Sequence, residues 1–124
     1  MRQPRILLLL ISLFALVLGA SAQDSKAETA KLAKLKAAYA SAKANLAKKP
    51  TDPAKRKAFV SATVSYGTAS MYSPILASKV KYRQALGLYR EALKIDPKNK
   101  EALENKKTIE DIYKQMGRPI PPSP

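Results

Sequence analysis

The chain has 124 residues, and its 23 Lys and Arg against 9 Asp and Glu give a formal net charge of +14. It contains no Cys, no His and no Trp. These absences exclude a thiol nucleophile, an imidazole base, a Ser-His-Asp triad and an ordinary zinc site, because each depends on Cys or His. We therefore expect no cofactor and no metal, and a function that depends on surface and shape.

The first 22 residues have the three parts of a secretory signal peptide. Basic Arg2 and Arg5 precede the apolar run Ile6–Leu18, and small residues follow, including Ala20 and Ala22. We predict cleavage after Ala22. A retained anchor is the alternative, but an apolar helix of roughly 13 residues spans about 20 Å, short of the roughly 30 Å hydrocarbon core. No Cys is present for lipid attachment, so the sequence predicts a secreted or periplasmic protein that is not transmembrane after processing.

A single helical domain is predicted over residues 23–117. From Ala27 to Lys49 the larger apolar residues recur at alternating steps of three and four, which is typical of an amphipathic helix. The next helix is predicted from Pro53 to Tyr72, with Asp52 as its N-cap and Pro53 at the first helical position. Its predicted buried stripe is Val60, Val64, Gly67 and Met71.

Two further helices are predicted over Ser78–Ile95 and Lys98–Met116, with Gly117 as the C-terminal cap of the last. The inward side chains of the last helix are predicted to be Ala102, Leu103, Ile109, Ile112, Tyr113 and Met116. Residues 118–124 contain four prolines and are predicted to form an extended tail. No alternating pattern of apolar and polar residues is long enough for a strand, so the predicted fold class is all-α. We expect about four helices in antiparallel hairpins, preceded by a signal-peptide helix.

The segment 82–102 resembles the second helix of a tetratricopeptide repeat (TPR). The resemblance is carried by the spacing of Ala85, Tyr89, Ala92, Leu93 and Pro97. It implies that small residues allow close helix approach, that Tyr89 and Leu93 fill the space between hairpins, and that Pro97 turns the chain. It also implies a groove, lined mainly by the first helix of each hairpin, that accepts an extended peptide or a partner helix.

A degenerate copy of the same spacing lies 47 residues earlier. Its residues are Ala38, Ala42, Asn45, Leu46 and Pro50. The family period is about 34 residues, so the copy implies insertions in the second helix and in the loop around Ser73. An unrelated four-helix bundle is the alternative to a stack of two hairpins. Since repeat arrays normally need about three units, we expect association with a partner or self-association.

The nine carboxylates are interpreted as helix caps and solvated helix faces, because helix starts favour acids. Glycosidase-like chemistry needs two convergent acids in a cleft. We therefore predict that the protein is not an enzyme and that it has no catalytic residues.

The second predicted helix is rich in hydroxyl side chains, which are poor helix formers. A binding surface for a protein or peptide is one explanation, and tight packing between long helices is the other. The candidate partner-binding residues are Ser61, Thr63, Ser65, Thr68 and Tyr72.

The densest basic cluster is Lys55, Arg56 and Lys57. Such a cluster attracts polyanions by long-range steering and counterion release. The candidates are lipopolysaccharide, a teichoic acid, a phospholipid headgroup or nucleic acid. The sequence thus favours an exported scaffold that binds a protein or peptide in the cell envelope, with a cationic binder of envelope polyanions as the alternative.

Overall fold

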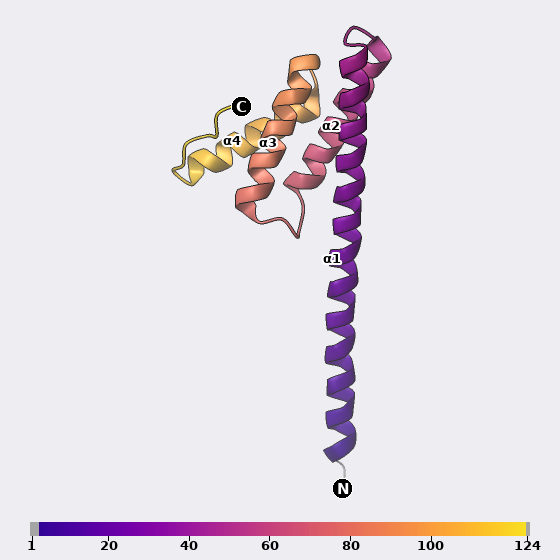
Figure 1. The fold of residues 1–124 in the computed structure, drawn as a ribbon. Coiled ribbons are helices and arrows are strands. Elements are labelled where there is room, and N and C mark those ends of the chain that lie inside the picture. Colours follow the sequence, from indigo (N-terminus) through magenta and orange to yellow (C-terminus); the bar gives the residue numbers. More distant parts are fainter. Residues whose placement is uncertain (1–2, 124) are drawn as a thin grey trace.

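The structure is a computed structural model that describes the backbone of residues 3–123 and the side chains of residues 22–123 (Figure 1). Four helices follow one another along the chain: α1 (Gln3–Lys48), α2 (Pro53–Met71), α3 (Ser78–Ile95) and α4 (Lys100–Gln115). Residues 3–123 contain no strand, which confirms the predicted all-α class.

The predicted leader lies outside the residues whose side chains are described, apart from Ala22, which is exposed. Its cleavage stays a prediction. Among the described residues, no helix combines the length and the apolar character needed to cross a membrane.

Most helix boundaries in the folded region follow local signals in the sequence. The Asp52 carboxylate accepts a hydrogen bond of 2.9 Å from the Lys55 amide, which confirms it as the N-cap of α2. Gly117 has a φ of 65°, a left-handed conformation that suits the residue after a helix. The prediction for α3 agrees with the structure, whereas α4 begins later than predicted, at Lys100, because Asn99 caps it through the Ala102 amide. The helix predicted from Ala27 is continuous with the residues before it, so that α1 begins at Gln3.

The central element is α2, which packs against α1 and α3 and also touches α4, while α4 packs against α3 (Figure 1). The core is made of side chains from α2, α3 and α4: Val60, Val64, Met71, Ala85, Leu86, Tyr89, Ala92, Ala102 and Ile109. Two of the residues predicted to face inward from α4, Leu103 and Met116, are 46% and 49% exposed, so that part of the prediction was wrong. The reason is that α4 lies at the edge of the fold and buries only the stripe of Ala102 and Ile109.

Gly67 allows α2 and α3 to pack closely. A Cβ atom at this position would lie 3.0 Å from Cε1 of Tyr89 and 3.4 Å from Cβ of Leu88. The Tyr89 ring is fully buried, and its hydroxyl lies 3.0 Å from both Oγ1 of Thr68 and Nδ2 of Asn105. Tyr89 therefore joins α2, α3 and α4 at one point.

A polar contact joins α1 to α3. The Tyr39 hydroxyl donates to the Glu91 carboxylate at 2.8 Å, and the Lys43 ammonium contacts both the Tyr39 hydroxyl at 3.0 Å and the carboxylate at 3.3 Å. Burial raises the pKa of the Tyr39 hydroxyl, and the hydrogen bond to Tyr39 raises the pKa of Lys43. The Tyr39 ring also stacks near Phe59 and Tyr66 of α2, so α1 is fixed to both neighbours.

The C-terminal segment 118–123 lies in no helix and folds back onto α3. Ile120 packs against the core, and the Arg90 guanidinium donates to the Pro121 carbonyl at 2.7 Å. This contact places the tail beside α3 and α4.

Candidate functional site

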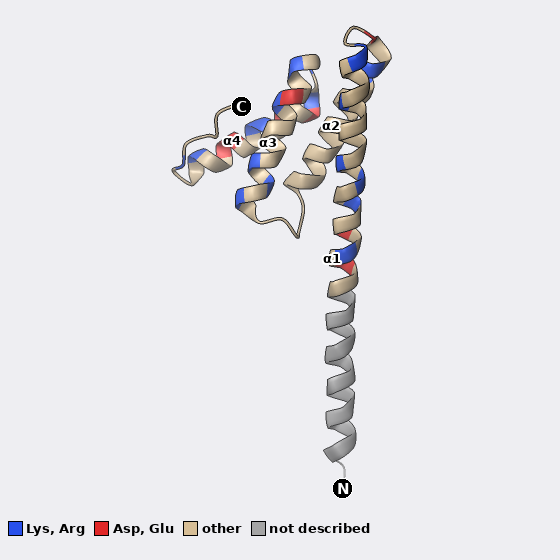
Figure 2. Cartoon of the chain, in the orientation of Figure 1, with Lys and Arg blue, Asp and Glu red and all other residues tan. Residues whose placement is uncertain are grey.

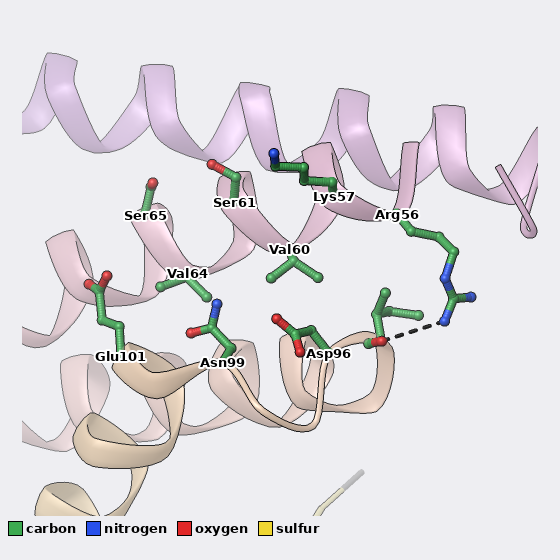
Figure 3. Close-up of a pocket in the computed structure, with 10 residues that line it drawn as sticks. Arg56, Lys57, Val60, Ser61, Val64, Ser65, Asp96, Asn99 and Glu101 are labelled. Atoms are coloured by element: carbon green, nitrogen blue, oxygen red, sulfur yellow. Dashed lines mark hydrogen bonds between the residues drawn. The ribbon is translucent and has the colours of Figure 1, made fainter. Parts of the chain in front are cut away.

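A groove runs along the outer face of α2, between α1 and the start of α4. It consists of two adjoining hollows, of about 470 Å³ and about 410 Å³, which share Ser65 and Glu101 as lining residues. The first hollow includes the N-terminal part of α2 and is shown in Figure 3. The second lies toward the C-terminal end of α2, beside Tyr72 and Pro74. We call the two hollows together the α2 groove.

The first hollow lies at the edge of the buried side of α2, where Val60 and Val64 adjoin the exposed Ser61 and Ser65. Phe59 and Tyr66 pack toward α1, while Val60, Val64 and Gly67 belong to the side that meets the core. Asp96, Asn99 and Glu101, from the end of α3 and the start of α4, face Val60 and Val64 across the first hollow (Figure 3). The connection between α3 and α4 thus forms one wall of the groove.

Four of the five predicted partner-binding residues line the α2 groove: Ser61, Ser65, Thr68 and Tyr72. Ser61 and Ser65 are exposed, and Tyr72 is 66% exposed. Thr63 does not belong to this surface, because its side chain is fully buried and its hydroxyl has no hydrogen-bond partner among the described residues.

Thr68 connects the groove to the core. Its hydroxyl oxygen lies 2.6 Å from Oε1 of Glu101, to which it donates, and 3.0 Å from the Tyr89 hydroxyl. Burial raises the pKa of the Tyr89 hydroxyl above its ordinary value. Glu101 is a groove residue that the sequence did not reveal, because its partner Thr68 lies 33 residues away on another helix.

The basic cluster predicted at the start of α2 is divided between two hollows. The Arg56 guanidinium donates to the carbonyls of Pro50, at 3.2 Å, and Ile95, at 3.4 Å (Figure 3), and so holds two loops together. Lys57 lines the α2 groove, whereas Lys55 lines a different hollow between α1 and α2. Arg56 therefore contributes to the structure, whereas no side-chain hydrogen bond or ion pair holds the two lysines among the described residues.

The charges along the α2 groove are mixed. Arg56 and Lys57 are opposed by Asp96 and Glu101 in the first hollow, and Lys31 pairs with Glu28 at 4.0 Å in the second. Exposed hydroxyls, carboxylates and an exposed tyrosine suit an extended polypeptide, whose backbone offers both donors and acceptors. In the described part of the chain, no three acidic side chains converge as metal ligands.

The positions that carry the TPR resemblance have distinct environments in the two copies. In α3, Ala85, Tyr89 and Ala92 are fully buried, Leu93 is partly buried and Pro97 is exposed in the turn that follows. In the degenerate copy, Ala38, Asn45 and Pro50 are exposed, whereas Ala42 and Leu46 are partly buried. The two copies thus differ in how far neighbouring helices cover them.

Comparisons of the chain with models of protein families, with curated proteins and with solved structures found no match.

Proposed function

We propose that the protein is an exported, non-enzymatic scaffold of TPR-like architecture that holds an extended segment of a partner protein of the cell envelope in the α2 groove. The observation that carries this proposal is that two hollows adjoin at Ser65 and Glu101. Both are lined by hydroxyl side chains of the central helix α2. The lack of Cys and His supports a binding role rather than catalysis.

The TPR-like assignment has separate support. Gly67 allows Tyr89 to approach α2 closely, and the small residues Ala85 and Ala92 are fully buried between neighbouring helices. The central helix α2 also touches α4, and residues of both helices line the groove. These contacts are of the kind that the repeat pattern implies.

Export is part of the proposal and is tested by the mass of the protein recovered from the envelope or the medium. A mature chain that begins at Gln23 is expected, because the small residues Ala20 and Ala22 precede the predicted cleavage site. An uncut chain in the membrane fraction would contradict export as a processed protein.

Binding in the groove is tested by placing a photo-reactive amino acid at Ser65 of the full chain in its native cells. The control is the same group at Ala40, which is exposed on α1. We expect Ser65 to give a discrete adduct with a protein, and we expect Ser61→Arg to abolish it by filling the neighbouring part of the groove. Equal adducts from Ser65 and Ala40 would contradict a specific groove.

Binding of an envelope polyanion is the second candidate function, and one observation favours it. Among the described side chains, Lys55 and Lys57 form no ion pair, and neither do Lys26, Lys34, Lys36, Lys48 and Lys49. If a polyanion is the ligand, affinity for polyphosphate falls steeply with salt, and Lys55→Glu with Lys57→Glu abolishes it. Arg56 is left intact in this test because its contacts with Pro50 and Ile95 are structural.

A further inference from the structure

A hollow outside the α2 groove lies where the start of α3 meets the end of α4 and the C-terminal segment. It has a volume of about 280 Å³. Small-molecule sites in proteins begin at about 300 Å³, so this size suits a small organic molecule better than a helix or a polymer chain. We call it the α3–tail hollow, because residues of α3 and of the segment 118–123 both line it.

The charged side chains that line the α3–tail hollow are all basic: Lys79, Arg83 and Arg118. Figure 2 shows basic residues at the start of α3. None of the three side chains forms an ion pair with another described residue. By contrast, the α2 groove and the hollow lined by Lys55 each include carboxylates as well as cations. The positive charge of the α3–tail hollow is therefore not balanced by its own walls, which favours an anionic ligand.

The acids of α4 that lie closest along the chain to this hollow already have partners. Glu110 pairs with Lys106, and Asp111 pairs with Lys107, each one turn earlier on the same helix. Their charges are thus neutralised within α4, and they leave the positive charge of the hollow free to attract a ligand.

The C-terminal segment holds the hollow in shape. The Arg118 amide donates to the Tyr113 carbonyl at 3.0 Å, which fixes the chain as it leaves α4. Further along, Ile120 packs against the core and the Arg90 guanidinium donates to the Pro121 carbonyl. Arg118 is therefore placed beside α3 before a ligand binds, and a preformed site loses less conformational freedom on binding.

The remaining walls of the hollow are mostly aromatic and apolar. Tyr82 and Tyr113 are partly buried and pack against the core, whereas Met116 is 49% exposed. The Lys81 ammonium lies 5.2 Å from the centre of the Tyr82 ring, so a further positive charge lies beside this ring. Tyrosine rings and methionine side chains pack well against flat apolar groups. The hollow thus combines cations for an anion with an aromatic surface for a ring.

We propose that the α3–tail hollow binds a small phosphate monoester whose organic part is a flat apolar ring. The phosphate lies among Lys79, Arg83 and Arg118, and the ring lies against Tyr82 and Tyr113. A phosphate monoester carries nearly two negative charges at neutral pH, and a guanidinium can donate two parallel hydrogen bonds to it. Three cations without a carboxylate among them therefore suit this group better than a singly charged anion. The site is separate from the α2 groove and from Lys55 and Lys57, so it is tested independently of the proposed function.

The test measures binding of three soluble probes to the full chain by titration calorimetry: phenyl phosphate, phenyl sulfate and inorganic phosphate. Phenyl sulfate keeps the ring but carries a single negative charge, and inorganic phosphate keeps the phosphate but lacks the ring. We expect phenyl phosphate to bind most tightly and each of the other two to bind at least about tenfold more weakly, because each lacks one half of the interaction.

Two lysines of α3 provide matched variants. Lys79 lines the hollow, whereas Lys94 is exposed in the last turn of the same helix and lies outside the hollow. Lys79→Gln and Arg118→Gln are each expected to weaken binding of phenyl phosphate at least about fivefold. Lys94→Gln removes the same charge and is expected to weaken it less than about twofold. The three side chains are exposed, so the variants are expected to stay folded, which circular dichroism checks.

NMR of the tyrosine rings locates the ligand. Phenyl phosphate is expected to shift the ring signals of Tyr82 and Tyr113, which line the hollow. The ring of Tyr39 lies near Phe59 and Tyr66 instead, and its signals are expected to stay unchanged. Shifts at Tyr39 without shifts at Tyr82 and Tyr113 would place the ligand elsewhere and overturn the proposal.

Three results of the binding measurements would also overturn it. The first is an equal effect of Lys79→Gln and Lys94→Gln, which would indicate general attraction of anions to a basic protein. The second is equal affinity for phenyl phosphate and inorganic phosphate, because the aromatic wall would then contribute nothing. The third is a lack of phenyl phosphate binding in a protein that binds vesicles containing phosphatidic acid, whose headgroup is also a phosphate monoester. The basic residues would then serve a membrane surface and not a soluble ligand.

Discussion

The close packing of Gly67 against Tyr89 predicts that substitution by alanine changes the stability in opposite directions at Gly67 and at Gly87. In Gly67→Ala the new Cβ would lie 3.0 Å from Cε1 and 3.4 Å from Cδ1 of Tyr89. The ring is fully buried and its hydroxyl is held by Thr68 and Asn105, so it has no space to move into. Overpacking of this kind costs about 1–3 kcal/mol, and replacing glycine inside a helix returns about 1 kcal/mol. The expected net effect is a destabilisation of about 1 kcal/mol.

Gly87→Ala is the matched control, because Gly87 also lies inside a helix but a Cβ there meets nothing within 4 Å. It is expected to stabilise the protein by about 0.5–1 kcal/mol through helix propensity alone. In a domain of this size, 1 kcal/mol shifts Tm by about 4–8 °C. The stability of both variants is measured by thermal and urea unfolding, with the helix content followed by far-ultraviolet circular dichroism. If Gly67→Ala raises Tm as Gly87→Ala does, the close packing of α2 on Tyr89 is refuted.

Three further predictions concern individual polar contacts. Tyr89→Phe removes the hydroxyl that joins three helices and is expected to cost about 1–2 kcal/mol in urea unfolding, whereas Tyr82→Phe serves as a control on the same helix. The pKa values of Lys43 and Tyr39 are both raised in the folded state, so their contribution to stability is present below the ordinary values of 10.5 and 10.0 and is lost as the pH rises through the folded values. The stability difference between the wild type and Lys43→Gln should therefore stay constant up to about pH 10 and shrink above it; a constant difference at higher pH would contradict the linkage. Arg90→Ala is expected to release the tail, so that NMR methyl shifts of Ile120 move toward random-coil values, while Arg83→Ala leaves them unchanged.

Features that depend on neighbouring residues in the chain could be predicted from the sequence. Asp52 followed by Pro53 predicts the start of α2 because a side-chain cap and a fixed φ act within one turn. The recurrence of Tyr82, Leu86, Tyr89 and Leu93 predicts α3 because a helix brings such positions to one face. Each of these two patterns lies within a single helix and the residues next to it, so it can be recognised without knowing the rest of the fold.

Features that depend on contacts between helices could not be predicted in the same way. Periodicity indicates that a helix has an apolar stripe but not how many neighbours cover it. For that reason the exposure of Leu103 in α4, and of Met116 directly after it, could not be predicted. The contact of Arg56 with the Ile95 carbonyl spans 39 residues, and no local pattern marks it. For the same reason Glu101 was interpreted as a solvated acid although it borders the α2 groove.

The two explanations for the hydroxyls of α2 can now be assigned residue by residue. Thr63 and Ser70 are buried, and Ser70 donates to the Tyr66 carbonyl, so small size and close packing account for them. Thr68 is held by its contact with Glu101. Ser61 and Ser65 are exposed in the groove and have no such packing role, although each lowers helix propensity.

These two serines therefore give a test in which stability and binding move in opposite directions. Ser61→Ala with Ser65→Ala is expected to stabilise the protein by about 0.5 kcal/mol at each position, because alanine is the better helix former. The same change removes two hydroxyls from the groove and is expected to weaken binding of the partner protein captured at Ser65. Paired measurement of urea unfolding and partner affinity distinguishes the alternatives. A variant that is more stable and binds the partner as tightly as the wild type would show that the hydroxyls are not part of the binding surface.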